Sequence, residues 1–455
     1  MTTRDDVEDS GITPEATDPG RRGHIGLIVA ASMLTGLLAA LLLALLVFGG
    51  ATEPVISGVV LIAFALSWAM LAWLSSRRTD QPQRWALAPA VFMGVVGLAL
   101  LVFRPSDGVL RAFGWVWPIA FAALVIWMIA QSRRSLHSWS RRVILYPIFA
   151  ISLIAAIGGG YETVREAQDR TAFAMPGQLF DVGGHELRIS CTGSGSPTVI
   201  VQSGLGESGV EMSGWIQPGV ATTTRVCVYD RAGKGWSEPA AAPQDGLAIA
   251  ADLHTLLGRA QVDGPYVLVG HSSGGIYMQI YAARYPEQVA GMVLLDSQPP
   301  DAFANLPGYT SFYNVYRRVL GLAPSLARLG VARVIATSAG TGLPPEVRAV
   351  ERAFASTASS ARSLRDEVVT LKASLTEAQA LTSLGDKPLI VVSEDNQAGW
   401  LPLQDKLANL STNSVHRFAQ NATHVSLIED QGDSAISVTA ILDVVDAVRL
   451  GTLVT

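Results

Sequence analysis

The stretch YVLVGHSSGGIYMQIYAARYP, residues 266–286, decides how this chain of 455 residues is organised. It begins with an apolar run, passes two serines that stand between glycines, and ends in a segment with the apolar spacing of a helix. Residues 270–274 read GHSSG and match the pattern G-x-S-x-G. In that pattern a serine sits on a tight turn between a strand and a helix, with its hydroxyl exposed. The stretch therefore predicts a nucleophile at the end of a buried strand.

Only one of the two serines meets the geometric requirement of that turn. Small residues must flank the nucleophile, because the backbone bends too tightly there for a side chain. Ser272 has Gly270 and Gly274 two residues to either side. Ser273 would instead have the bulkier His271 two residues before it. We therefore predict Ser272 as the nucleophile and expect Ser273 to contribute its backbone N–H.

Short apolar runs alternate with helical patterns from Gln178 onward. The runs that we expect to form strands are a hairpin turning at Gly183-Gly184, then TVIVQ, RVCVY, YVLVG, GMVLL, PLIVV and SVHRFA. This alternation is typical of an α/β fold with a mostly parallel sheet and helices on both faces. Between GMVLL and PLIVV about 90 residues show only helical patterns, so we expect a helical cap at about 298–386.

The first third of the chain is too apolar for an ordinary soluble domain. Across the sequence 49% of residues are hydrophobic, 16% are charged and the mean hydropathy is +0.33. Five apolar stretches without interior Asp, Glu, Lys or Arg run roughly over residues 25–48, 55–74, 85–103, 113–130 and 143–157. Each approaches the ~20 residues needed to cross a bilayer. We predict an all-α region of about five membrane-spanning helices at 25–160, after a tail at 1–24.

Arginines in the loops predict the orientation of these helices. Ten lie in the tail and in the loops after the second and fourth stretches: Arg4, Arg21, Arg22, Arg77, Arg78, Arg84, Arg133, Arg134, Arg141 and Arg142. The other two loops contain only Arg104 and Arg111. Because basic loops stay in the cytoplasm, the N-terminus should be cytoplasmic and everything after Gly160 extracytoplasmic. Residues 161–176 would form a juxtamembrane linker or a helix extension, and the lysine-poor, alanine-rich composition favours a bacterial cell membrane protein.

At this point the chain resembles the α/β-hydrolase superfamily, in particular its serine esterases and proline-iminopeptidase-like members. Besides the serine turn, the segments QSGLGES (202–208), YDRAGKGWSEP (229–239) and YAARYPEQVAGMVLLD (281–296) carry the resemblance. It covers residues 177–455 and implies an α/β-hydrolase fold. It also implies an oxyanion hole made by the backbone N–H groups of Leu205 and Ser273. One departure is Ser203, which stands where such enzymes commonly have histidine.

The resemblance further implies a histidine base near the end of the chain. His424 lies in a loop after the last expected strand and is our candidate. His416 falls within that strand, and His185 and His254 lie early in the domain. We interpret His271, directly before the nucleophile, as structural.

Two aspartates compete for the acid that orients the imidazole. Family members hold the acid either at the end of the sixth strand, where Asp296 stands, or in the loop after the seventh, which contains Asp395. Asp296 is favoured because a rigid strand next to the nucleophile strand would hold it in place. Asp395 is one position short of the expected place, which Asn396 occupies. Both candidates stay open from the sequence.

Cys191 and Cys227 are candidates for a disulfide. They lie in or at the ends of two strands that are neighbours in the usual sheet order of the family. An extracytoplasmic domain permits the bond. The alternative is a pair of buried free thiols.

Other chemistries find little support in the sequence. The seven histidines are scattered, and neither C-x-x-C nor G-x-x-x-x-G-K-[ST] occurs. The net charge is −5, without a basic stripe. We therefore expect no cofactor, no metal and no nucleic-acid partner. A serine nucleophile also argues against the epoxide-hydrolase and dehalogenase branches, which the resemblance implies use aspartate.

The sequence thus predicts a membrane-anchored serine hydrolase. It would cleave an ester or amide through a Ser-His-Asp triad and an acyl-enzyme, with a small acyl or lipid-like substrate and the lipid bilayer as partners. Peptidase activity is compatible with the same fold. The alternatives are an acyltransferase with the same acyl-enzyme, and a non-catalytic ligand-binding sensor.

Overall fold

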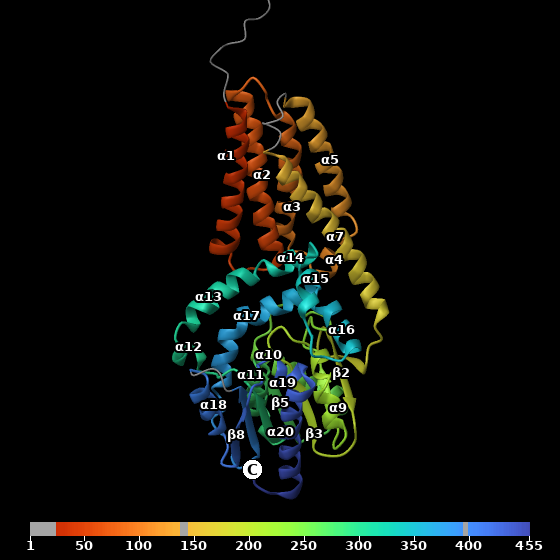
Figure 1. Ribbon diagram of the computed structural model, residues 1–455, viewed down its shortest axis with the longest axis vertical. Coiled ribbons are helices and arrows are strands. Elements are labelled where there is room, and N and C mark those ends of the chain that lie inside the picture. Colours follow the sequence, from red (N-terminus) through yellow and green to blue (C-terminus); the bar gives the residue numbers. More distant parts are fainter. Residues whose placement is uncertain (1–23, 137–143, 395–398) are drawn as a thin grey trace, which may run out of the picture.

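The computed structural model describes residues 24–136, 144–394 and 399–455. It has two parts stacked along the long axis of the molecule, a helical bundle and an α/β domain (Figure 1). The first helix begins at the end of the bundle far from the α/β domain, and the C-terminus lies at the opposite end of the molecule.

The bundle consists of long apolar helices. The helices described there are α1 (Ile25–Leu41, continued by the π-helical η2, Leu42–Val47), α2 (Glu53–Arg78), α3 (Leu87–Phe103, after the 3-10 turn η3, Arg84–Ala86), α4 (Asp107–Phe113), α5 (Trp117–Ser135) and α7 (Tyr146–Ala172). The segments 25–47, 53–78, 84–103 and 146–172 are each long and apolar enough to cross a membrane. Helices α4 and α5 meet the same test together, although they are bent by 46°.

Two boundaries in the bundle differ from the predicted spans. The fourth span was expected at 113–130, but α5 begins at Trp117 and continues to Ser135. Pro118 explains the shift, because its ring blocks a hydrogen bond to the preceding turn but is tolerated at the start of a helix. The fifth predicted span, 143–157, is followed by more helix, since α7 continues to Ala172. Most of the segment at 161–176 is thus a helix extension.

The α/β domain contains a mostly parallel eight-stranded sheet, as predicted. Its strands are β1 (Gln178–Asp181), β2 (Glu186–Thr192), β3 (Thr198–Gln202), β4 (Val226–Tyr229), β5 (Tyr266–His271), β6 (Val289–Leu295), β7 (Leu389–Glu394) and β8 (Ser414–Ala419). They lie in the order β1-β2-β4-β3-β5-β6-β7-β8. Strand β2 is antiparallel to both of its neighbours, and the pairs from β4 to β8 are parallel. The central position of β5 places the serine turn in the middle of the sheet.

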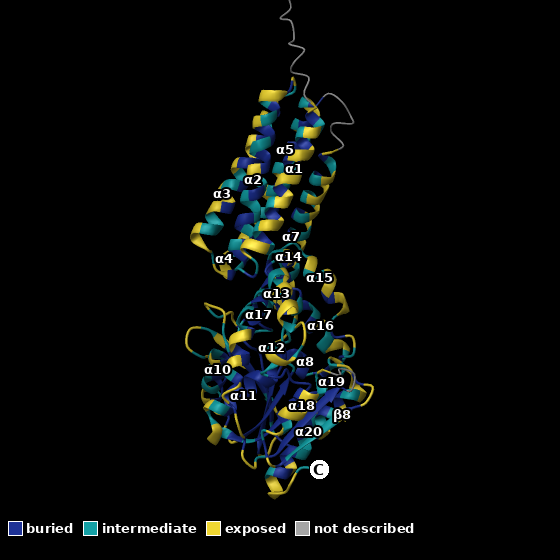
Figure 2. Ribbon diagram, turned by 90° about the vertical axis from the view of Figure 1, so that its left-hand side faces the viewer, coloured by how far each residue is buried: buried dark blue, intermediate teal, exposed yellow. Residues whose placement is uncertain are grey.

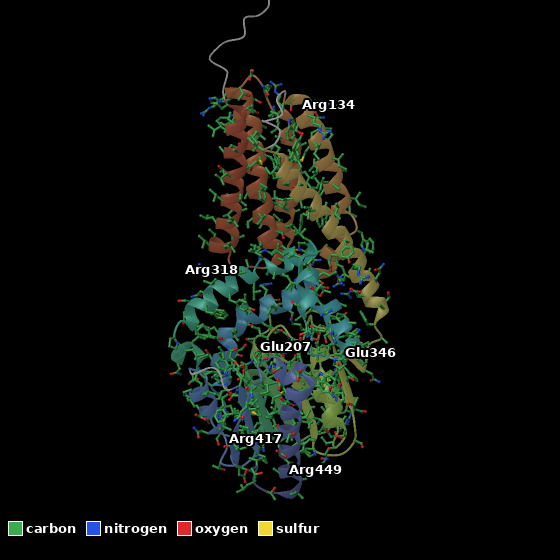
Figure 3. The ribbon with its side chains drawn as sticks, viewed as in Figure 1. Arg134, Glu207, Arg318, Glu346, Arg417 and Arg449 are labelled. Atoms are coloured by element: carbon green, nitrogen blue, oxygen red, sulfur yellow. A yellow bond between two sulfur atoms is a disulfide. The ribbon has the colours of Figure 1, made fainter. Side chains whose placement is uncertain are left out.

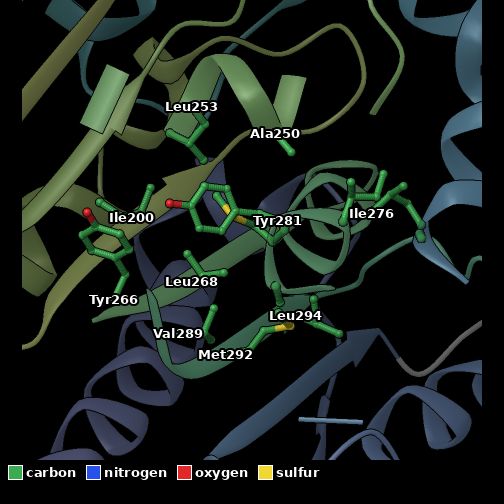
Figure 4. Close-up of a cluster of buried hydrophobic side chains, with 14 of the residues drawn as sticks. Ile200, Ala250, Leu253, Tyr266, Leu268, Ile276, Tyr281, Val289, Met292 and Leu294 are labelled. Carbon is green, nitrogen blue, oxygen red and sulfur yellow. The ribbon is translucent and has the colours of Figure 1, made fainter. Parts of the chain in front are cut away.

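Helices cover both faces of the sheet. Successive side chains of a strand point to opposite faces, and here the side chains on both faces are apolar. On one face, α10 (Gly246–Arg259) and α11 (Gly274–Arg284) pack on side chains such as Leu268 (Figure 4). On the other, α9 (Ile216–Ala221) and α20 (Gln431–Leu450) pack on neighbours such as Val267 and Val269. The remaining helices of the domain body are α8 (Gly209–Met212), α18 (Leu401–Ala408) and α19 (Ser426–Glu429).

A helical cap follows β6 and lies between the bundle and the sheet (Figure 1). It contains α12 (Ala302–Asn305), α13 (Tyr309–Leu320), α14 (Ala323–Arg328), α15 (Val331–Ile335), the 3-10 turn η5 (Ala336–Ser338), α16 (Pro345–Ala355) and α17 (Ala358–Ala378). Figure 2 shows that exposed residues line the outside of the bundle, whereas the sheet is buried.

Candidate active site

The predicted nucleophile occupies a strained turn at the end of β5. Ser272 has a φ of +54°, in the left-handed region that non-glycine residues rarely adopt. A Cβ at Gly270 would lie 2.5 Å from the backbone of Gly275, and one at Gly274 would lie 2.5 Å from the carbonyl oxygen of Gln202. The flanking glycines are therefore required by backbone contacts. Ser272 itself is half-buried.

Asp296 and His424 are brought together at the carboxyl edge of the sheet. Asp296 follows β6 and is fully buried, and its Oδ2 lies 2.5 Å from His424 Nδ1. The second oxygen, Oδ1, accepts a hydrogen bond from Trp400 Nε1 at 3.0 Å. The other candidate acid, Asp395, lies outside the described residues.

The serine lies beside this pair through its backbone. Its carbonyl accepts hydrogen bonds from Gln298 N at 3.0 Å and Ser297 Oγ at 3.2 Å, and both residues directly follow Asp296. Within the described residues no hydrogen bond joins the Ser272 hydroxyl to His424. Such contacts are often open in a substrate-free site and tighten in the complex.

The backbone of His424 is held on both sides. Its N–H donates to Glu394 Oε2 at 3.0 Å, and its carbonyl accepts from His271 Nε2 at 2.9 Å. The imidazole ring itself is about one-third exposed, at 34%. The backbone of His424 is therefore fixed by two hydrogen bonds, while its ring stays partly exposed.

His271 belongs to a buried ion pair that the sequence did not suggest. Its Nδ1 lies 3.0 Å from Glu207 Oε2, which also accepts from Gly204 N at 2.5 Å. Because Nδ1 faces a carboxylate and Nε2 faces the His424 carbonyl, both ring nitrogens are placed to donate, as in an imidazolium. Burial opposes the charge, but Glu207 outweighs it and raises the pKa of His271. Burial likewise works to raise the pKa of Glu207, but His271 holds it below its usual value. Figure 3 shows Glu207 between the sheet and the cap.

The loop expected to form the oxyanion hole is held by Arg231. This buried guanidinium donates to the carbonyls of Ser203 at 2.6 Å and Gly204 at 2.5 Å, and it pairs with Glu367 of α17 at 3.1 Å. Glu367 also accepts from Gly206 N at 2.9 Å. Within the described residues the backbone N–H of Leu205 and of Ser273 donates to no protein group. An oxyanion hole needs N–H donors that are not already used by the protein.

The other singled-out residues lie away from this edge or have structural partners. Cys191 and Cys227 occupy paired positions of β2 and β4 and form a disulfide. His416 contacts Ser393 Oγ and Asp405 Oδ1, both at 2.6 Å. His185 pairs with Asp252, and His254 contacts Gln288. No group of His, Cys, Asp or Glu in the described residues has an arrangement that could hold a metal ion.

Known proteins resemble the α/β domain and reveal little about the remainder. Residues 197–345 match a family described as the alpha/beta hydrolase fold. An uncharacterized protein of Schizosaccharomyces pombe is 35% identical over 156 residues, which cover 28% of this chain and 29% of that protein. An uncharacterized vacuolar membrane protein of Saccharomyces cerevisiae is 29% identical over 104 residues, covering 22% and 16% of the two chains. The chain thus spans less than a third of the length of these relatives.

Solved structures agree on the fold. An epoxide hydrolase of Acinetobacter nosocomialis superposes with a TM-score of 0.51 at 15% identity, covering 62% of this chain and 96% of that one. At this identity the likeness shows the fold alone.

Proposed function

We propose that this protein, whose C-terminal domain belongs to the alpha/beta hydrolase superfamily, is a membrane-anchored serine hydrolase that works through an acyl-enzyme on Ser272. The proposal is carried by the hydrogen bond between His424 Nδ1 and the buried Asp296, beside a serine on a strained strand-to-helix turn. A buried carboxylate behind an imidazole, next to such a serine, is the arrangement that activates a hydroxyl for attack.

The proposed reaction assigns each group one task. Asp296 keeps the Nδ1–H tautomer of His424, so that Nε2 can take the Ser272 proton. The serine oxygen then attacks the acyl carbonyl, and the N–H groups of Leu205 and Ser273 stabilise the negative charge on its oxygen. His424 gives its proton to the leaving group. Water, deprotonated by the same histidine, then releases the acid and restores Ser272.

His271 and Glu207 act as positioning residues in this proposal. The hydrogen bond from His271 Nε2 to the His424 carbonyl sets where the base begins, and Glu207 keeps the donating form of His271. Glu207 also binds Gly204 N, one residue before the proposed oxyanion donor Leu205. The pair therefore connects the base to the oxyanion loop.

An acyl substrate associated with the membrane suits this arrangement best. The carboxyl edge of the sheet faces the cap, and the cap faces the bundle (Figure 1). We propose that the domain is extracytoplasmic in a bacterial cell membrane, because the described arginines at the helix ends far from the α/β domain, such as Arg134 (Figure 3), belong to the arginine-rich loops. Small esters and lipid-like acyl groups are the expected substrates.

Labelling with a fluorophosphonate probe tests the proposal directly. We expect the wild type and Ser273→Ala to be labelled, because that variant keeps its backbone N–H, and Ser272→Ala to be unlabelled. Failure of folded wild-type protein to react would favour a ligand-binding sensor. A membrane-impermeant probe that labels intact cells would support the extracytoplasmic placement. Product analysis with an added acceptor alcohol separates hydrolysis from acyl transfer.

A further inference from the structure

The cap is attached to the bundle by ion pairs at the ends of the bundle helices. Arg328 and Arg362 contact both Glu53 and Asp107, with distances to Asp107 of 2.7 and 3.1 Å. Glu53 begins α2 and Asp107 begins α4. These carboxylates therefore mark the end of the apolar bundle that faces the α/β domain. The two cap arginines that bind these carboxylates therefore lie at this end of the bundle.

Glycines let the turn between α14 and α15 lie against α7. A Cβ at Gly158 would lie 2.3 Å from the carbonyl oxygen of Leu329, and one at Gly330 would lie 3.1 Å from the carbonyl oxygen of Gly158. Gly158 directly follows Ile157, the last residue of the fifth apolar stretch. The cap thus reaches the depth at which the apolar part of the bundle ends.

Helix α13, which adjoins this region, keeps an exposed apolar face. Phe312, Val315 and Val319 are 61%, 61% and 52% exposed, and their spacing puts them on one side of the helix. On the neighbouring α15, Val334 and Ile335 are 72% and 68% exposed. Side chains on the outer face of the bundle have similar exposure. Figure 2 shows exposed residues on these cap helices next to the bundle.

Two arginines of α13 lie beside the loop that joins the first two bundle helices. A Cβ at Gly49 would lie 2.6 Å from the Arg318 side chain, and one at Gly50 would lie 3.0 Å from that of Arg317. Figure 3 shows Arg318 at the end of α1 that faces the α/β domain. Within the described residues, neither arginine has a carboxylate in ion-pair distance. Arg328 in the same cap is fully paired.

We propose that α13, with α15 beside it, is an interfacial membrane helix that docks on the lipid leaflet facing the α/β domain. Phe312, Val315 and Val319 lie among the acyl chains at the leaflet surface. Arg317 and Arg318 bind phosphates of anionic lipids, which is the pattern of an amphipathic helix lying in the membrane plane. The bilayer is the expected occupant because this face continues the apolar surface of the bundle.

The docked helix connects the leaflet to the proposed active site. The Tyr309 hydroxyl, at the start of α13, accepts a hydrogen bond from Gln298, two residues after Asp296. A helix held by lipid therefore fixes one side of the cap over the sheet edge. This inference goes beyond the proposed function, since lipid docking does not require catalysis.

Quenching by spin-labelled lipids tests the docking in the full-length protein. Val315→Cys is labelled with a fluorophore and reconstituted in vesicles that contain doxyl lipids. Phe418→Cys on β8 is the matched control, because Phe418 is 51% exposed but lies away from the bundle. The native cysteines form a disulfide and do not compete for the label. We expect quenching at position 315 to exceed that at position 418 several-fold. Equal quenching, or cross-linking of position 315 between two copies, would overturn the proposal.

The phosphate contact is tested with vesicles of phosphatidylcholine, with and without phosphatidylglycerol. We expect the anionic lipid to increase quenching at position 315, and the double variant Arg317→Gln/Arg318→Gln to abolish that increase. Arg259→Gln/Arg284→Gln, at the ends of α10 and α11, serves as the charge-matched control. If phosphatidylglycerol has no effect on the wild type, or the same effect on the double variant, the arginines do not bind lipid phosphates. Neither readout uses turnover, so the serine hydrolase proposal stands or fails separately.

Discussion

Replacing Asp296 by Asn should inactivate the proposed triad, because Asp296 accepts hydrogen bonds from two donors and asparagine can accept only one of them. In the wild type, Oδ2 meets His424 Nδ1 and Oδ1 accepts from Trp400 Nε1. An asparagine offers one acceptor and one donor in these two places. Because the indole can only donate, the amide oxygen must face Trp400 and the NH2 group must face His424.

This orientation forces the imidazole into the unproductive tautomer. An NH2 group that donates to Nδ1 leaves the ring proton on Nε2, which then cannot accept a proton from Ser272. A triad aspartate replaced by asparagine in this way lowers kcat by about 10⁴-fold. We therefore expect Asp296→Asn to lose about 10³- to 10⁴-fold in kcat, or roughly 4–5.5 kcal/mol of barrier.

The assay is ester hydrolysis by purified protein in detergent, with the melting temperature as a check on folding. In the double variant Asp296→Asn/Trp400→Phe the amide is free to rotate, and we expect about tenfold recovery relative to Asp296→Asn. Asp395→Asn should stay within about twofold of the wild type. Near-full activity of Asp296→Asn, together with a large loss in Asp395→Asn, would refute the reasoning.

Two further predictions concern stability. The Cys191–Cys227 disulfide closes a loop with a sequence separation of 36, so Cys191→Ser/Cys227→Ser should lower the free energy of unfolding by about 4 kcal/mol, measured by denaturant titration. Burial raises the pKa of Glu351 to about 7, and Ser208 and Glu211 lie against it. A raised pKa in the folded state stabilises the fold at low pH, and this contribution is lost as pH rises from about 4.5 through 7. Glu351 should therefore contribute a loss of stability on the order of 3 kcal/mol as the pH rises from about 5 to 8, and the melting temperature of Glu351→Gln should fall less than that of the wild type over this range. An identical pH profile in both proteins would contradict this assignment.

The fold was predictable because its signals are local. The flanking glycines of Ser272 are fixed by backbone contacts within a few residues and across the adjacent strand. The length and spacing of apolar residues likewise predict the buried strands and the long helices from short windows of sequence. The start of α5 differs from the expected span at 113–130, because a proline is favoured in the first turn of a helix and apolar composition does not register this.

Much of the candidate site depends on contacts that no local pattern encodes. Glu207 and His271 are 64 residues apart, and Trp400 and Asp296 are 104 apart. Whether such side chains meet is decided by which loops converge at the carboxyl edge of the sheet. The sequence suggested His424 and Asp296 through a resemblance, whereas the partners of His271 became visible only in the folded chain.

Helix α7 has a consequence for the kinetics of any substrate carried in the bilayer. Its 27 residues correspond to about 40 Å, longer than a hydrocarbon core of about 30 Å, so the helix continues out of the membrane without a flexible joint. Together with the ion pairs from Arg328 and Arg362 to Glu53 and Asp107, this helix holds the domain next to the bundle, so a substrate carried in the bilayer would reach it by lateral diffusion. Turnover should then follow the mole fraction of substrate in the lipid: diluting the vesicle suspension leaves the rate per enzyme unchanged, whereas adding inert lipid to the same bilayer lowers it.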